Sequence, residues 1–421
     1  MQKLNTKRTI LTGLAFLSIC TFWQIYDSII PLILKEDFAI GDTLSGVIMA
    51  LDNVLALFLL PMLGALSDKT HTKLGRRMPY ILAGTACAVV FMMLLPVSAR
   101  ARNLPLFMAA LTLLSMSLDR SPAVALMPDL TPKPLRSKGN AIINLMGAVG
   151  GVMVLGFITV MVPKTENPDY TAVFATAAIV MVVSVTILAL TIRENKMAVK
   201  DEPEEKERAE NAPQRGLSAP EKRSLVLILA SVFFWFMGYN AVTTAFSKYA
   251  RAYWGLTGGA FAYTLIIAQA AAICAYLPVA ALSQRIGRRK TILCGVTGLT
   301  LAFGAAVFFR SFNYGMFALF ALAGISWAAI NVNSYPMVVE LAKGADVGKY
   351  TGFYYTFSMA AQIITPILSG FLLENVGYHT LFPYGAVCVA VSFFTMLFVR
   401  HGDAKTEKLS SKLEAFASPD D

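Results

Sequence analysis

Four ionisable residues lie inside long apolar segments, where a charge is costly. They are Asp27, Asp52, Asp119 and Arg120. On insertion scales, a charged side chain at the centre of such a segment costs roughly 2.5 to 3.5 kcal/mol, so each one is a candidate for function. Removing a carboxylate from water favours its protonated form, which lets it bind and release a proton. Three acids and one base therefore point to binding of a proton or a sodium ion.

The composition indicates that these residues lie in a membrane. The chain has 421 residues, is 56 % hydrophobic and has a mean hydropathy of +0.60, whereas soluble domains are about 45 to 50 % apolar. Apolar segments of about 20 residues, long enough to cross a bilayer as a helix, recur along the chain. We expect twelve transmembrane helices, at Ile10–Leu34, Leu44–Ser67, Pro79–Ser98, Leu104–Met127, Gly139–Val162, Ala172–Ile192, Ser224–Ser247, Gly258–Ser283, Thr291–Phe309, Tyr314–Val339, Gly352–Leu373 and His379–Val399.

The net charge of +10 is explained by topology rather than by nucleic acid. Most lysines and arginines fall in the loops on the side of the chain termini, which by the positive-inside rule is the cytoplasmic side. We therefore expect a multi-pass protein of the cell (inner) membrane with both termini in the cytoplasm. No catalytic triad, metal-ligand spacing or Cys-x-x-Cys pair is present, so the sequence gives no support for an enzyme, and we expect no resident metal or cofactor.

One polar stretch divides the chain into two halves of six helices. Arg193–Arg223 is rich in both charges and poor in large apolar residues, a composition that cannot bury enough surface to fold by itself. We predict an N-terminal bundle over residues 1–192, a cytoplasmic linker over 193–223, a C-terminal bundle over 224–400 and a cytoplasmic tail over 401–421.

The two halves also repeat short motifs. Ala65–Arg77, "ALSDKTHTKLGRR", corresponds to Ala281–Lys290, "ALSQRIGRRK". Pro128–Leu130 at the end of the fourth predicted helix corresponds to Val339–Leu341 at the end of the tenth. A parallel repeat of two six-helix bundles places a substrate site at their interface, near the middle of the bilayer. The expected fold is thus an all-α membrane protein whose bundles are related by a pseudo-twofold axis.

The loop after the second predicted helix resembles a family signature. Its Gly64-x-x-x-Asp68-Lys69 start and Gly75-Arg76-Arg77 end are similar to the signature loop of the major facilitator superfamily. The longer stretch "SDKTHTKLGRRMPYILAG" and the segment "SPAVALMPDLTP" resemble the glycoside-pentoside-hexuronide cation symporters and the related sucrose-proton symporters. The resemblance implies the major facilitator fold and secondary active transport of a sugar or glycoside with a proton or sodium ion. The expected partners are a small-molecule substrate and the lipid bilayer, with the protein acting as a monomer.

We assign the membrane acids to coupling and binding. Asp52 lies about 12 Å below the outer end of its predicted helix, close to the midplane, so Asp52 and Asp27 are the predicted ion-coupling residues. Paired donors and acceptors suit vicinal hydroxyls, and an aromatic face commonly completes a sugar site. The predicted substrate residues are Asp27, Asp119, Arg120, Tyr26, Gln24, Asn331, Trp327 and Gln362. The second half offers only neutral polar groups at similar depth.

The signature loop predicts a cytoplasmic gate. A carboxylate at Asp68 can accept hydrogen bonds from loop arginines and from the N-terminal amides of a neighbouring helix, which would hold the inner helix ends together and favour the outward-open state. The alternative is that the basic residues only set topology. Since Gln284 replaces Asp68 in the second copy, a second latch would be uncharged. The predicted gate residues are Gly64, Asp68, Lys69, Gly75, Arg76, Arg77, Gln284 and Arg288.

The sequence leaves two other functions open. The chain could carry another small solute, including by drug or metabolite antiport with protons, or it could be a non-transporting sensor on a carrier fold. The glycine-rich segment from Gly147 to Gly156 lacks the Gly-Pro element that is typical of drug-proton antiporters, which counts against efflux. No additional domain supports the sensor.

Overall fold

The computed structural model describes residues 4–116, 120–132, 135–165, 167–197, 217–341 and 347–403. These residues form helices joined by short turns, and no strand occurs among them. The helices are α1 Thr6–Thr12, α2 Leu14–Glu36, α3 Asp42–Lys69, α4 Met78–Arg100, α5 Leu104–Ser115, α6 Arg120–Leu130, α7 Arg136–Met161, α8 Thr171–Thr191, α9 Glu194–Met197, α11 Ala219–Ala252, α12 Ala262–Ile286, α13 Arg288–Ala306, α14 Gly315–Glu340, α15 Val347–Asn375, the 3-10 turn η2 Tyr378–Thr380, and α16 Leu381–Leu397.

The predicted membrane helices correspond to these elements. Ten helices of the described residues are long and apolar enough to cross a membrane, with α1 and α2 counted as one span. The fourth predicted span corresponds to the short apolar helix α5 followed by α6, and the ninth to α13, whose first turn is basic. The all-α membrane fold is therefore confirmed.

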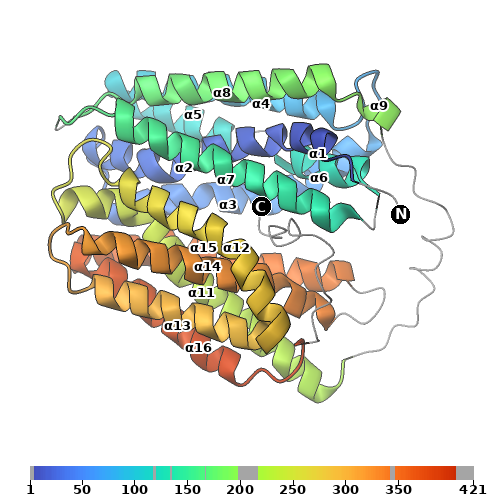
Figure 1. The fold of residues 1–421 in the computed structure, drawn as a ribbon. Coiled ribbons are helices and arrows are strands. Elements are labelled where there is room, and N and C mark those ends of the chain that lie inside the picture. Colours follow the sequence, from blue (N-terminus) through green and yellow to red (C-terminus); the bar gives the residue numbers. More distant parts are fainter. Residues whose placement is uncertain are drawn as a thin grey trace.

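The helices form two layers that follow the order of the sequence. In Figure 1, α1 to α8, coloured blue to green, lie above α11 to α16, coloured yellow-green to red. In the N-terminal bundle α2 packs on α7 and α8, and in the C-terminal bundle α14 packs on α12 and α13 while α11 packs on α16. Between the bundles, α3 packs on α15 and α7 packs on α12. These two helix pairs border the space between the bundles.

The molecule has a near end and a far end. The near end is where α1 begins and where α8 and α16 finish, and the far end is where α2 finishes and α3 begins. The bundles touch closely at the far end, because Gly46 of α3 lies against the Pro366 carbonyl of α15 and Gly259, just before α12, lies against the Ile158 carbonyl of α7. Neither position has room for a Cβ atom.

The predicted linker and tail are only partly described. Residues 198–216 and 404–421 lie outside the described residues, so the domain boundaries at 192, 223 and 400 stay predictions. The helix after the linker is longer than we predicted: α11 runs from Ala219 to Ala252 rather than from Ser224 to Ser247. This extension adds a further turn at the far end and includes Lys248 in the helix.

Candidate functional site

Two adjoining cavities lie between the bundles. The larger has a volume of about 380 Å³ and the smaller about 190 Å³. Four residues line both of them, namely Cys20, Trp23, Asp27 and Asn240. The first three belong to α2 and the last to α11, so both bundles contribute to the boundary between the cavities.

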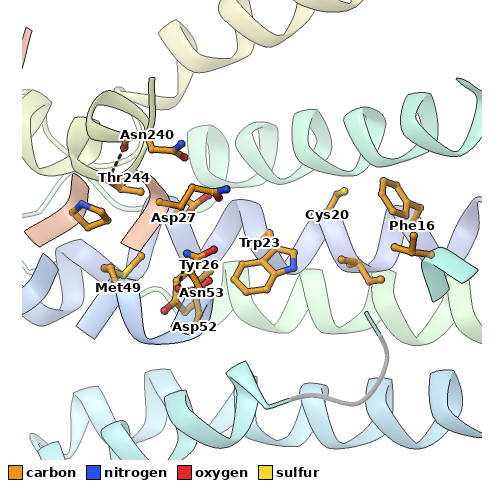
Figure 2. A pocket seen from close by; sticks show the side chains of 14 residues that line it. Phe16, Cys20, Trp23, Tyr26, Asp27, Met49, Asp52, Asn53, Asn240 and Thr244 are labelled. Atoms are coloured by element: carbon orange, nitrogen blue, oxygen red, sulfur yellow. Dashed lines mark hydrogen bonds between the residues drawn. The ribbon is translucent and has the colours of Figure 1, made fainter. Parts of the chain in front are cut away.

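The two predicted coupling acids line the smaller cavity. Asp52 of α3 is only 5 % exposed, and its Oδ1 accepts a hydrogen bond of 3.0 Å from the Asn53 side chain. Asp27 of α2 is half-buried and also lines the larger cavity. Figure 2 shows Asp52 and Asn53 next to Tyr26, with Asp27 on the side of α2 that faces Asn240 and Thr244. The structure thus brings the two acids to one polar region.

The structure also brings most of the predicted substrate residues to these cavities. Tyr26 and Gln362 line the smaller one, and Gln24, Trp327 and Asn331 line the larger one. Asp119 lies outside the described residues, and Arg120 begins α6 but its side chain is not among those described. The roles assigned to all eight residues stay predictions.

An aromatic wall that the sequence did not identify flanks the larger cavity. Tyr239 of α11 stacks on Trp327 of α14 with ring centroids 3.6 Å apart and planes 4° apart. Phe236 meets Trp327 edge-on at 5.3 Å. Sequence reasoning selected Trp327 but missed Tyr239, since nothing in the pattern of α11 shows which of its many aromatic residues faces the neighbouring helix.

A buried ion-pair cluster joins the bundles at the far end. Lys248 of α11 lies 2.9 Å from Asp42 of α3, and both side chains are 4 % exposed. Lys35 lies 2.9 Å from the same carboxylate, and the Tyr378 hydroxyl donates to it at 2.8 Å. We refer to Lys35, Asp42, Lys248 and Tyr378 as the far-end cluster. Sequence reasoning missed Lys248, because it lies just beyond the predicted end of its helix but inside α11, whereas the second-half polar residues at the depth of the cavities are neutral.

A second set of contacts reinforces the far end nearer the surface. Arg251 of α11 lies 2.7 Å from Glu36 of α2 and donates to the Tyr170 hydroxyl at 2.8 Å. Tyr170 precedes α8, and its burial raises the pKa of its hydroxyl well above the usual value, although the positive charge of Arg251 opposes this shift. Glu374 of α15 accepts the Thr43 amide at 2.8 Å. These contacts therefore hold the two bundles together at the far end.

The predicted gate residues of the first half form a cluster within the N-terminal bundle. Arg77 pairs with Asp68 and lies 2.9 Å from Asp129 of α6, while Arg76 lies 2.6 Å from Asp129. The Arg77 guanidinium also donates to the Gly64 carbonyl at 3.3 Å. Lys69 ends α3 and is exposed. The Asp68 ion pair is thus formed within one bundle while the far end is closed.

A carboxylate that the sequence did not suggest accepts the backbone amides at the start of α4. Glu194, which begins α9, accepts the amides of Arg76, Arg77 and Met78 at 2.9 to 3.0 Å. Gly75 precedes them with a φ of +120° and has no room for a side chain beside Glu194. The expectation that Asp68 would take these amides is therefore wrong, because Asp68 faces the Arg77 side chain instead.

The C-terminal bundle carries a charged copy of this cluster. Arg288 pairs with Glu340 at the end of α14, as Arg77 pairs with Asp129. Asp403 accepts the amides of Arg288 and Arg289 at 2.8 and 3.3 Å, as Glu194 does in the first half. Gln284 is half-buried on α12. The prediction of an uncharged second copy is wrong, since Glu340 supplies the acid that Gln284 lacks.

Two repeated helix bundles with two adjoining cavities between them, within a chain of membrane-spanning helices, define the class: a multi-pass transporter of small solutes with the major facilitator fold, rather than an enzyme. The family follows from the sequence itself. The model of the MFS/sugar transport protein family matches residues 15–401, so the chain belongs to this family.

Solved structures with the same fold are similar over nearly the whole chain. A variant of the nucleoside transporter NupG is 13 % identical with a TM-score of 0.67, covering 93 % of this chain and 98 % of that one. The human organic anion transporter MFSD10 is 16 % identical with a TM-score of 0.60, over 94 % and 100 %. The transporter FucP in its outward conformation is 14 % identical with a TM-score of 0.58, over 94 % and 99 %. At these identities the similarity establishes the fold alone.

A curated relative matches over a shorter stretch. The chloramphenicol resistance protein CraA of Acinetobacter baumannii is 28 % identical over 110 residues, which are 26 % of this chain and 25 % of that protein. The chain thus aligns with about a quarter of the length of this relative. The match leaves the substrate open.

Proposed function

We propose that the protein is a symporter that couples the movement of a sugar or glycoside to that of a proton or sodium ion by alternating access. The observation that carries the proposal is that Asp27 and Asp52 line one cavity between the two bundles. The family description, a sugar transport protein, supports the substrate class.

The position of Asp27 suggests how the ion and the solute are coupled. Asp52 is the more buried acid, which makes it the first candidate to take up a proton or a sodium ion. Asp27 lines both cavities and can therefore contact a solute in the larger one while remaining near the ion. Two ligands that share one group influence each other's affinity by the same factor. Symport requires such a coupling.

The lining of the larger cavity suits a polyhydroxylated solute. The amides of Gln24, Gln269 and Asn331 can donate and accept hydrogen bonds, and Trp327 with Tyr239 supplies an apolar wall. Asp119 and Arg120 are further residues that we propose to bind the solute. Sugars require both features, because their hydroxyl groups need paired partners and their ring faces carry apolar C–H groups.

We place the near end in the cytoplasm, on the charge distribution of the loops, and the protein in the inner membrane. With this orientation the far end is the outer one, and its closed contacts correspond to an inward-facing state. The clusters around Arg77 and Arg288 would then lie at the cytoplasmic gate, each of them formed within one bundle.

Uptake into proteoliposomes tests this proposal. Radiolabelled sugars should accumulate only when an inward proton or sodium gradient is imposed. Asp52→Asn should abolish accumulation while leaving exchange of sugar across the membrane measurable. Asp169→Asn, a change of an exposed acid in a loop, is the matched control and should behave like wild type. Accumulation that is unaffected by Asp52→Asn and by collapse of both gradients would show that the coupling proposal is wrong.

A proton-coupled antiporter is the second candidate, because the 110-residue match is to a chloramphenicol resistance protein. The direction of the gradient separates the two. An antiporter would concentrate chloramphenicol in vesicles whose interior is acidic, and it would show no sugar uptake with the opposite gradient.

A further inference from the structure

Two amide oxygens on the C-terminal bundle are buried without a hydrogen-bond partner. They are Oε1 of Gln269 on α12 and Oδ1 of Asn331 on α14. Asn331 is 7 % exposed, and both residues line the larger cavity. A buried acceptor without a partner costs about 1 to 3 kcal/mol. Two such atoms in one cavity point to a ligand that supplies the missing donors.

The two acceptors belong to one wall of the cavity. α12 and α14 pack closely, because Gly324 of α14 lies against the backbone of Ala268, the residue before Gln269. Asn331 follows Trp327 by four residues on α14, so both side chains lie on the same face of that helix. The wall therefore combines two acceptors with the stacked Trp327 and Tyr239 rings.

Gly151 of α7 determines how close this wall comes to the N-terminal bundle. A Cβ atom at residue 151 would lie 2.8 Å from Nε2 of Gln269 and 3.3 Å from Oε1 of Gln24. α2, α7 and α12 thus meet at this glycine, with an amide from each bundle beside it. Gly156, five residues further along α7, faces open space, with nothing within 4 Å of a Cβ atom.

We propose that Gln269 and Asn331 form a specificity-determining half-site that accepts hydrogen bonds from the hydroxyl groups of a neutral polyhydroxylated solute. The Trp327 and Tyr239 stack forms the apolar side of this half-site. Gly151 provides the space that lets Gln269 reach the solute from the opposite bundle. That the solute is transported rests on the function proposed above, whereas the half-site itself concerns binding.

Leucine substitutions combined with deoxy sugars test the half-site. In proteoliposomes, Gln269→Leu and Asn331→Leu should each raise the KM of the best neutral sugar about tenfold, as expected for loss of one well-formed hydrogen bond. Gln269→Glu keeps an acceptor and should stay within about threefold of wild type. For the monodeoxy analogue that lacks the recognised hydroxyl, wild type and the leucine variant should have equal KM values.

A pair of glycine variants on one helix tests the spacing. Gly151→Ala should raise the KM of the same sugar because its methyl group displaces Gln269, whereas Gly156→Ala should leave it unchanged. Equal effects of the two substitutions would contradict the role of Gly151.

The possible failures are distinguishable. If the wild type takes up neutral sugars but both leucine variants keep its KM for every sugar and deoxy analogue, the half-site is wrong and the transport proposal stands. If the wild type takes up none, equilibrium binding of the same sugars, followed by tryptophan fluorescence, tests the half-site alone. Binding that Gln269→Leu weakens would support it, and absence of binding by the wild type would overturn it.

Discussion

The two ends of this transporter use ion pairs in different ways. At the far end, Lys248 and Arg251 of one bundle pair with acids of the other. At the near end, Arg77 and Arg288 pair with acids of their own bundle. In the alternating-access cycle that we propose, contacts between bundles must break, whereas contacts within a bundle can persist. The far-end pairs therefore contribute to the balance between conformations, and the near-end clusters hold each bundle together.

The largest expected effect comes from Asp42, which faces two lysines and a tyrosine. Asp42→Asn leaves Lys248 buried without a counterion, and removing one partner of a buried pair costs roughly 3 to 5 kcal/mol. Opening of the far end relieves this cost. The reporter is Ser45→Cys, at a position that is 0 % exposed, in a variant that lacks the five native cysteines. A thiol reagent added on the far side of the membrane should label this cysteine more than tenfold faster when Asp42→Asn is also present.

Two further variants make this test specific. Lys248→Met added to Asp42→Asn removes the stranded charge and should return part of the protection. Asp169 forms an exposed ion pair of 3.4 Å with Arg100, at the same end but within one bundle. Asp169→Asn should therefore leave labelling unchanged. Labelling that Asp42→Asn does not accelerate would show that the far-end cluster does not hold the bundles together.

A smaller effect is expected at the near end. Glu194→Ala removes the acceptor of three amides, a loss of roughly 1 to 3 kcal/mol, and should lower the thermal unfolding midpoint by several degrees. Asp403→Ala, which affects two amides, should lower it by less. Both variants should leave labelling at Ser45→Cys unchanged. Faster labelling in Glu194→Ala would mean that the near-end cluster also controls the far end.

The smallest effect concerns pH and the loop before α8. Hydrogen bonds from Thr171 to the Asp169 carboxylate hold its pKa below the usual value. A lowered folded-state pKa contributes stability above the unfolded value of about 3.9, and this contribution is lost as the pH falls through the folded value. The unfolding midpoints of wild type and Asp169→Asn should thus differ slightly at pH 6, and the difference should shrink as the pH falls below the unfolded value of about 3.9. A constant difference across this range would contradict the assignment.

The sequence predicted the architecture well because apolar length and repeated motifs are local signals. The helices, the two halves and the central position of Asp27 and Asp52 all follow from such signals. The far-end cluster does not follow from these signals, since the apolar segment ends at Ser247 whereas α11 continues to Ala252, and Lys248 is buried. A charged residue just beyond an apolar segment is easily mistaken for a loop residue.

The other omissions have a different cause. Glu194 lies more than a hundred residues from the amides it accepts, and no pattern in one sequence pairs such distant positions. Gln269 resembles any neutral polar residue in a membrane helix until its neighbours and its unpartnered oxygen are known. Side-chain partners, unlike helices, depend on packing that the order of residues does not reveal.

The buried contact between Asp42 and Lys248 also has a consequence for temperature. Each opening of the far end moves this pair from the protein interior into water. Hydration of charged groups becomes less favourable as temperature rises, so the closed arrangement gains relative to the open one on warming. The same protein should therefore spend a larger share of its time closed at that end in a warm cell than in a cold one.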